Sequence, residues 1–207
     1  MKMKLHCMPG ACSLAAHIVL EWIGTPYEIE IHAHDQLHQP AYLRVNPQGA
    51  VPALEVDGDV ITQNAGVLTY LGESHPEAKL LGDGSPRSAA EVHRWLGFIN
   101  SDLHPAFKPL FGATRYLGDE AMIEKTRANA RETVHRLFER LDAQLKGRDW
   151  IAGTAGHSLA DAYLYALTRW TQGVGVDIGS LQELARFVMT MNADPAVQRA
   201  LKAEGLS

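Results

Sequence analysis

Cys12 is the residue whose type and position are best suited to chemistry. It follows a short strand-like run and the turn pair Pro9-Gly10, and it precedes a segment with helical spacing. Free amides and the dipole at a helix start favour an anion, so this position favours a thiolate. Lowering a thiol pKa from about 8.5 to about 6.5 needs ~2.7 kcal/mol. The dipole contributes only about 0.3–1 kcal/mol, so another donor is needed, and the Ser13 hydroxyl is nearest. Position alone leaves open a small buried cysteine.

The remaining sulfur and imidazole groups suggest no metal centre. Cys7, the only other cysteine, lies in the apolar strand segment and is expected in the core. Two cysteines are too few for a disulfide framework or a four-cysteine zinc site, and the C-x-x-C pattern is absent. His32, His34 and His38 share one loop without a neighbouring cysteine or carboxylate cluster. We therefore expect a solvated loop and predict no metal site.

Two further pairs have positions that suit a ligand. Val51-Pro52 stands just before a predicted strand, where proline cannot donate to a sheet ladder. Spacing alone gives no reason to depart from a trans bond there. Gln63-Asn64 precedes a predicted helix, where side chains and free amides can receive a carboxylate or form an ordinary N-cap.

The first 80 residues predict the elements that position these groups. Helical spacing after Cys12 ends at Gly24, and residues 27–31 alternate apolar and polar side chains as a half-buried strand does. Asp57-Gly58 predicts a tight hairpin between two short strands. A helix follows over residues 65–74. The order β-α-β, then β-β-α, fits a small mixed sheet of thioredoxin type.

The rest of the chain predicts helices alone. Residues 81–87 are rich in glycine, serine and proline, and we predict a linker there between domains 1–80 and 88–207. Beyond it, apolar residues keep helical spacing. Ser158 and Asp161 have the spacing of a capping box, and Asp194-Pro195 opens the last helix.

Composition excludes several classes of protein. A hydrophobic content of 46% argues against disorder, and a net charge of -5 gives no basic field for nucleic acid. The N-terminus lacks the apolar stretch of a secretory signal, and no run approaches the ~20 apolar residues of a membrane span. We therefore expect a soluble cytoplasmic protein that binds neither nucleic acid nor membrane.

Five segments, in this order and spacing, resemble those of glutathione transferases, most closely the bacterial beta class: PGACSLAAH, NPQGAVPAL, ITQNAGVLTYL, SDLHPAFKPLF and HSLADAYL. The resemblance covers essentially the whole chain. It implies an α/β thioredoxin-like domain that binds glutathione, an all-α domain with a pocket for a hydrophobic electrophile, and a homodimer. The implied enzyme transfers glutathione, its cosubstrate, to alkyl or aryl electrophiles in detoxification.

The resemblance also implies roles for individual residues of the first domain. Cys12 would lie against the glutathione sulfur and form a mixed disulfide with it. Val51, before a cis Pro52, would pair its backbone with the cysteinyl part of glutathione. Gln63 and Asn64 match the pair that holds the γ-glutamyl carboxylate.

One helical segment of the second domain is implicated in the same way. Ser101, Asp102 and His104 match residues that face the glutathione site, and His104 is the second candidate for polarising the bound thiol. Pro105 follows where a lysine is common, and proline disfavours helical geometry in the preceding residue. This departure leaves the direction of His104 open.

Other departures keep alternatives open. Ala11 stands where a serine is common, and Cys7 stands where beta-class members often have tyrosine. The loop lacks the lysine expected at the glycyl carboxylate, for which His34 or His38 would have to substitute. One alternative is a glutathione-dependent disulfide reductase or peroxidase that uses Cys12 directly. The other is a non-catalytic binding protein of the same fold.

Overall fold

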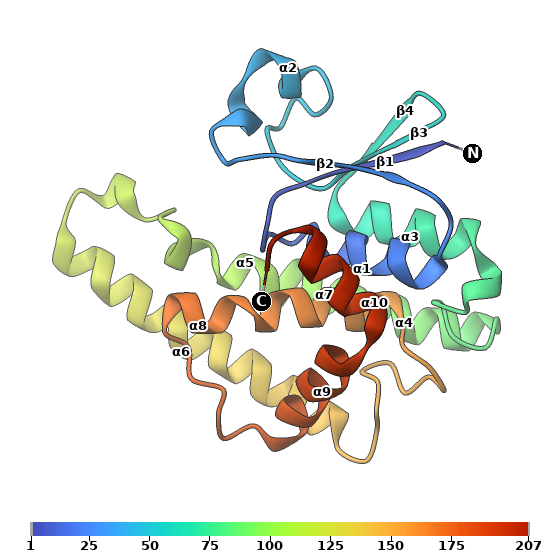
Figure 1. Ribbon diagram of the computed structural model, residues 1–207. Helices are drawn as coiled ribbons and strands as arrows, with labels where there is room; N and C mark the ends of the chain where they lie inside the picture. Colours follow the sequence, from blue (N-terminus) through green and yellow to red (C-terminus); the bar gives the residue numbers. More distant parts are fainter. Residues whose placement is uncertain (1, 207) are drawn as a thin grey trace.

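The computed structural model describes residues 2–206, and its first part is a mixed four-stranded sheet (Figure 1). The strand order is β2-β1-β3-β4. β1 runs parallel to β2 and antiparallel to β3, and β3 runs antiparallel to β4. The strands are β1 (Met3–Cys7), β2 (Glu28–Ile31), β3 (Ala53–Val56) and β4 (Asp59–Thr62).

Helices cover both faces of this sheet. α1 and α3 lie on one side of the strands and α2 lies on the other (Figure 1). The helices of this part are α1 (Leu14–Ile23), η1 (Gln36–His38), α2 (Pro40–Leu43), α3 (Asn64–Ser74) and η2 (Pro76–Ala78). The predicted small mixed sheet of thioredoxin type is confirmed.

The turn residues act where the sequence placed them. Gly24 ends α1 with a left-handed φ of 72°, which costs glycine little because it has no Cβ. Asp57 and Gly58 have φ values of 50° and 100°, as a tight hairpin turn requires. The end of α1 and the turn between β3 and β4 therefore lie within a residue or two of their predicted positions.

After residue 80 the described chain forms helices and connecting turns, as predicted. They are α4 (Pro86–Phe98), the π-helical turn η3 (Ile99–Leu103), α5 (His104–Ala106), η4 (Lys108–Phe111), η5 (Arg115–Leu117), α6 (Glu120–Leu145), α7 (Leu159–Thr168), α8 (Trp170–Val174), α9 (Gln182–Ala193) and α10 (Pro195–Ala203). Through residue 206, no helix is long and apolar enough to cross a membrane.

One apolar core runs through both parts of the chain. α1 packs against α3 and also against α7 and α10 of the helical part. Cys7 is fully buried in this core, as expected. α4 begins inside the predicted 81–87 linker, so the domain division stays a prediction.

Polar contacts also join the two parts. The Trp22 indole donates to Asp194 at 3.0 Å, and His17 pairs with Glu204 at 2.9 Å. The Trp170 indole donates to the Gly10 carbonyl at 2.8 Å. This last bond fixes the turn that carries Cys12 against the helical part.

Both predicted helix starts in the second half are confirmed. Ser158 and Asp161 form the reciprocal capping box at the start of α7. The Asp194 carboxylate accepts from the amides of Ala196 and Val197 at the start of α10.

Candidate active site

A cavity of about 370 Å³ lies where the turn after β1, the loop before β3 and the start of α3 face the helical part. Five of the predicted site residues line it: Cys12, Val51, Gln63, Asn64 and His104. The other lining residues are Asn46, Gln48, Ala50, Pro52, Asn100, Pro105, Lys108 and Tyr163. Segments far apart in sequence therefore converge on one site.

Cys12 lies in the turn before α1, with 9% of its surface exposed. Its thiol donates to the Val51 carbonyl at 3.4 Å. Burial raises the pKa of the Cys12 thiol to about 12, although its own amide and that of Ser13 act in the opposite direction. The prediction of a low-pKa thiolate is wrong for this state of the protein, because desolvation outweighs the two amides.

The predicted role of the Ser13 hydroxyl is also wrong. Its oxygen accepts from the Met8 amide at 3.2 Å and donates to the Met8 carbonyl at 3.4 Å. The hydroxyl therefore closes the turn after β1 and is not free to donate to the sulfur. The two backbone amides of this turn remain as the donors that favour an anion.

Val51 presents its backbone to the cavity. The Val51–Pro52 peptide is cis, as the resemblance implied. Within residues 2–206 the Val51 amide has no hydrogen-bond partner, while its carbonyl accepts only the Cys12 thiol. The preceding carbonyl of Ala50 is held by the Tyr42 hydroxyl at 2.7 Å and the Asn46 amide group at 2.6 Å. An extended ligand can therefore pair with a fixed backbone edge.

The start of α3 offers an open set of donors. Gln63 precedes the helix with a φ of 69°, and its side chain makes no cap bond, so the ordinary N-cap alternative is wrong. Its amide group donates instead to Gln48 at 2.8 Å. The Asn64 amide group donates to the Cys12 carbonyl at 3.1 Å, while its buried oxygen has no partner in the described chain. The first amides of α3 thus suit a carboxylate.

His104 reaches the cavity despite Pro105. The π-helical turn η3 precedes it, and His104 itself keeps helical dihedrals. Its Nδ1 hydrogen-bonds with the Tyr163 hydroxyl at 2.5 Å, and its ring meets Trp170 edge-on at 4.9 Å. Burial, followed by the charge of Lys108, lowers the pKa of His104 to about 4. The ring is therefore neutral at pH 7 and is a weak base.

The structure does not bring Ser101 and Asp102 to the cavity. Ser101 donates to the Gly97 carbonyl at 2.7 Å and to Asp102 at 2.9 Å, and both side chains are exposed. On a helical segment, residues four apart share a face, so Asn100 accompanies His104 whereas Ser101 and Asp102 turn away. Neither His34 nor His38 is among the lining residues.

Sequence reasoning missed several lining residues, Asn100 and Gln48 among them, although it considered Tyr163 as a wall of the electrophile pocket. The Tyr163 hydroxyl lies 3.4 Å from the Asn100 oxygen and also contacts His104, and burial raises the pKa of Tyr163 so that it stays protonated. Asn100 had a usable signal, its four-residue spacing from His104. Gln48 is positioned by Asn46, whose side chain accepts its amide at 3.1 Å in the turn before Val51. Residue spacing did not predict this turn, so the position of Gln48 could be assigned only from the folded structure.

The pKa of His104 predicts acid sensitivity. Because the folded state favours the neutral ring, its contribution to stability is complete above pH 6.5 and is lost as pH falls through 4, up to about 3 kcal/mol. In denaturant unfolding, the stability advantage of the wild type over His104→Asn should shrink from pH 7 to pH 4. The exposed His34→Asn should follow the wild type. Parallel pH profiles of wild type and His104→Asn would contradict this prediction.

Two family models match the chain. The glutathione S-transferase N-terminal domain matches residues 10–74, and the glutathione S-transferase C-terminal domain matches residues 103–195. Glutathione S-transferase GST-4.5 of Xanthomonas campestris is 49% identical over 205 residues, which cover 99% of this chain and 100% of that protein.

Solved structures give the same picture. A glutathione S-transferase from Xylella fastidiosa matches with a TM-score of 0.96 and 49% identity, over 99% of this chain and 100% of that one. A sphingomonad glutathione S-transferase complexed with glutathione matches with a TM-score of 0.86 and 37% identity, over 99% of this chain and 100% of that one. A bacterial beta class glutathione S-transferase of Sphingomonas chungbukensis matches with a TM-score of 0.87 and 33% identity, over 99% of this chain and 100% of that one.

Proposed function

This chain belongs to the glutathione S-transferase family, and we propose that it binds glutathione extended along the 370 Å³ cavity and activates its thiol for attack on electrophiles. One observation carries the proposal. A buried thiol, an open backbone edge and an uncapped helix start line the same cavity. These three features suit the thiol, the peptide backbone and the carboxylate of the tripeptide.

The γ-glutamyl carboxylate would bind at the start of α3. The first amides of this helix are open, and the Gln63 and Asn64 side chains lie beside them. The peptide groups of the cysteinyl residue would pair with Val51 in strand fashion, which uses its free amide. This alignment leaves the glutathione sulfur next to Cys12.

Cys12 would act on that sulfur as a hydrogen-bond donor. Burial raises the pKa of the Cys12 thiol to about 12, so the thiol is protonated at pH 7. The neutral S–H can turn from the Val51 carbonyl to a bound thiolate, and the amides of Cys12 and Ser13 add to its stabilisation. The nucleophile is then the glutathione sulfur.

The proposed conjugation is a substitution and needs no oxidant. The glutathione thiol loses its proton to water, its sulfur forms a bond to the electrophilic carbon, and the leaving group departs with its bonding electrons. His104, Lys108 and Tyr163 form the helical wall of the cavity, where the electrophile would lie. The raised pKa of Cys12 argues against a reductase or peroxidase, since that chemistry needs the protein thiolate itself.

Calorimetric titration with glutathione, followed by turnover of an aryl halide, tests the proposal. We expect Gln63→Gly to weaken glutathione binding about tenfold, because one polar contact to the γ-glutamyl carboxylate is lost. Glycine is the replacement because it tolerates the positive φ at this position. The matched change Gln182→Gly, at an exposed position of α9, should leave affinity unchanged.

A second ligand makes this test specific. The dipeptide cysteinylglycine lacks the γ-glutamyl group, so wild type and Gln63→Gly should bind it equally. If Gln63→Gly weakens both ligands alike, the carboxylate does not bind at α3. If the wild type shows neither binding nor turnover, a non-catalytic protein of the same fold is the better description.

We also propose that the protein is a cytoplasmic homodimer of the beta class that acts in detoxification. The overall resemblance and the likeness to a beta class structure support this. The net charge of -5 favours no nucleic-acid partner. Light scattering on the purified protein gives the oligomeric state.

A further inference from the structure

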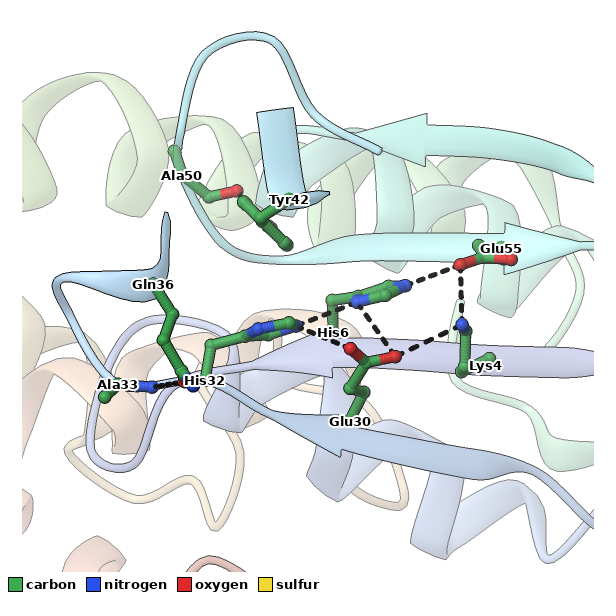
Figure 2. Close-up of polar contacts among 9 residues, drawn as sticks. All are labelled: Lys4, His6, Glu30, His32, Ala33, Gln36, Tyr42, Ala50 and Glu55. Atoms are coloured by element: carbon green, nitrogen blue, oxygen red, sulfur yellow. Dashed lines mark hydrogen bonds and ion pairs between the residues drawn. The ribbon is translucent and has the colours of Figure 1, made fainter. Parts of the chain in front are cut away.

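A cluster of two imidazoles and a carboxylate, His6, His32 and Glu30, lies on the face of the sheet that carries Tyr42 of α2 (Figure 2). Alternate residues of a strand point to the same face, so Lys4 and His6 of β1 lie together, and Glu30 and His32 of the β2 edge lie beside them. The register pairs His6 with Glu30, and the His32 amide extends this pairing by donating to the Cys7 carbonyl at 2.8 Å.

The ligand atoms of this cluster are close to a coordinating geometry. His6 Nδ1 and His32 Nε2 are 2.9 Å apart, and the two Glu30 oxygens each lie 3.8 Å from one of these nitrogens (Figure 2). A tetrahedral zinc ion places such ligand atoms about 3.4 Å apart. The two nitrogens are about 0.5 Å closer than this, and each is about 0.4 Å farther from its nearer Glu30 oxygen, so a small rotation of the carboxylate would let one oxygen face both nitrogens.

A fourth residue orients His6. The Glu55 carboxylate accepts a hydrogen bond from His6 Nε2 at 2.6 Å, so His6 Nδ1 carries a lone pair and accepts the Nε2–H of His32 at 2.9 Å; a bound ion would take the place of that proton. A carboxylate that holds the far nitrogen of a ligating histidine is the usual support of a metal-bound imidazole. His6 is fully buried, so its ring is held in this orientation.

The cluster also opens onto space for a further ligand. A cavity of about 480 Å³ is lined by His6, Glu30, His32 and Tyr42, among others. Three protein ligands with an open fourth position form the pattern of zinc sites that keep a bound water. Two imidazole nitrogens favour zinc and similar transition metals over calcium or magnesium, which prefer oxygen.

Lys4 competes for the same carboxylates. Its ammonium lies 2.9 Å from Glu55 and 3.2 Å from Glu30, and the side chain is 27% exposed. In this arrangement the single ammonium offsets one of the two negative charges. Because its stem is flexible and partly solvated, it can move outward when a divalent ion takes its place.

We propose that His6 Nδ1, His32 Nε2 and a Glu30 oxygen bind a divalent cation of the zinc class, with water as the fourth ligand. From the sequence, His32 groups with His34 and His38 in one loop, and no metal site was expected there. The structure instead pairs His32 with a histidine 26 residues earlier. This proposal is independent of the proposed transferase function.

A bound ion would also stabilise the loop that reaches the glutathione cavity. The rings of His6 and His32 pack on Tyr42, with centroid separations of 5.7 and 4.6 Å. The Tyr42 hydroxyl holds the Ala50 carbonyl, next to Val51 (Figure 2). An ion bound by His6 and His32 would hold both rings against Tyr42. Tyr42 in turn holds the loop that carries Ala50 and Val51.

The test uses the full chain without a histidine tag, stripped with a chelator. Calorimetry with Zn²⁺ should give one equivalent, and Co²⁺ should give the visible absorption of a four- or five-coordinate site. We expect Glu30→Gln and His32→Asn to weaken binding of both ions at least tenfold. Lys4→Met should tighten binding several-fold, because the competing ammonium is removed. Circular dichroism verifies that each variant folds.

His34→Asn is the matched control, since His34 is exposed in the same loop and lies outside the cluster. It should bind both ions as the wild type does. The proposal is overturned if the stripped wild type binds neither ion, or if His34→Asn loses binding while Glu30→Gln and His32→Asn retain it. A Co²⁺ spectrum of a hexa-aqua or surface-bound ion, unchanged in His32→Asn, would also overturn it.

Discussion

Replacing Cys12 by alanine is expected to abolish the mixed disulfide between this protein and glutathione, while glutathione affinity changes by no more than about twofold. Cys12 is the only one of the two cysteines that lines the cavity, because Cys7 is fully buried in the core. The contacts proposed to hold the tripeptide come from Val51 and α3 and survive the change. Intact mass after incubation with glutathione disulfide, together with calorimetric titration, measures both effects.

The rate of this adduct and the conjugating activity provide further checks. Because the pKa of Cys12 is raised to about 12, adduct formation by the wild type should accelerate roughly tenfold per pH unit between pH 7 and 9. Conjugation should fall only about fivefold in Cys12→Ala, the loss of one hydrogen bond of about 1 kcal/mol. Cys7→Ala should still form the adduct. Persistence of the adduct in Cys12→Ala, or loss of glutathione binding, would refute the assigned geometry.

Replacing Asp161 by alanine is expected to cost about 3–5 kcal/mol of the free energy of unfolding, a large share of the 5–15 kcal/mol typical of a domain. The carboxylate accepts from the amides of Ile151 and Ser158, both at 2.8 Å, and from the Ser158 hydroxyl at 2.6 Å. These residues are fully buried, so water cannot replace the lost acceptor. Burial raises the pKa of Asp161 to about 6, so at pH 7.5 the group is ionised.

Denaturant unfolding at pH 7.5 measures this loss, and an exposed cap provides the control. Asp119 caps α6 by accepting from the Met122 amide at 3.0 Å in solvent. Asp119→Ala should therefore cost only about 1 kcal/mol. Equal losses in the two variants would show that the buried network around Asp161 contributes no more than an ordinary cap.

The parts of the fold that sequence predicted are those controlled by local chemistry. Gly24, Asp57-Gly58 and the box of Ser158 and Asp161 act through their own dihedrals or through neighbours three residues away. Such signals need no knowledge of tertiary contacts. The domain boundary was harder, because one apolar core crosses it and α4 begins within the predicted linker.

The chemistry of the site was predicted less well, because it depends on burial. The position of Cys12 before a helix correctly indicated two favourable amides, yet desolvation raises its pKa instead of lowering it. Burial likewise makes His104 a weak base. Ser101 and Asp102 lie between the lining residues Asn100 and His104 in sequence but turn away from the cavity. Residue type and spacing alone do not predict how deeply a side chain is buried, how far its pKa is shifted or which way it points.

The histidine cluster shows the same limitation. His6 and His32 are brought together by the parallel pairing of β1 with the β2 edge, and Glu55 reaches them from β3. The sequence placed His32 only among its loop neighbours. A strand register would have been needed to see that His6 and Glu30 face one another.

The most direct measurement is a crystal structure of the protein with reduced glutathione. The proposed geometry predicts the ligand sulfur within hydrogen-bonding distance of Cys12 Sγ, its cysteinyl peptide groups paired with Val51, and its γ-glutamyl carboxylate at the first amides of α3. Glutathione bound with its ends reversed, or at another surface while Cys12 keeps its bond to the Val51 carbonyl, would contradict the account.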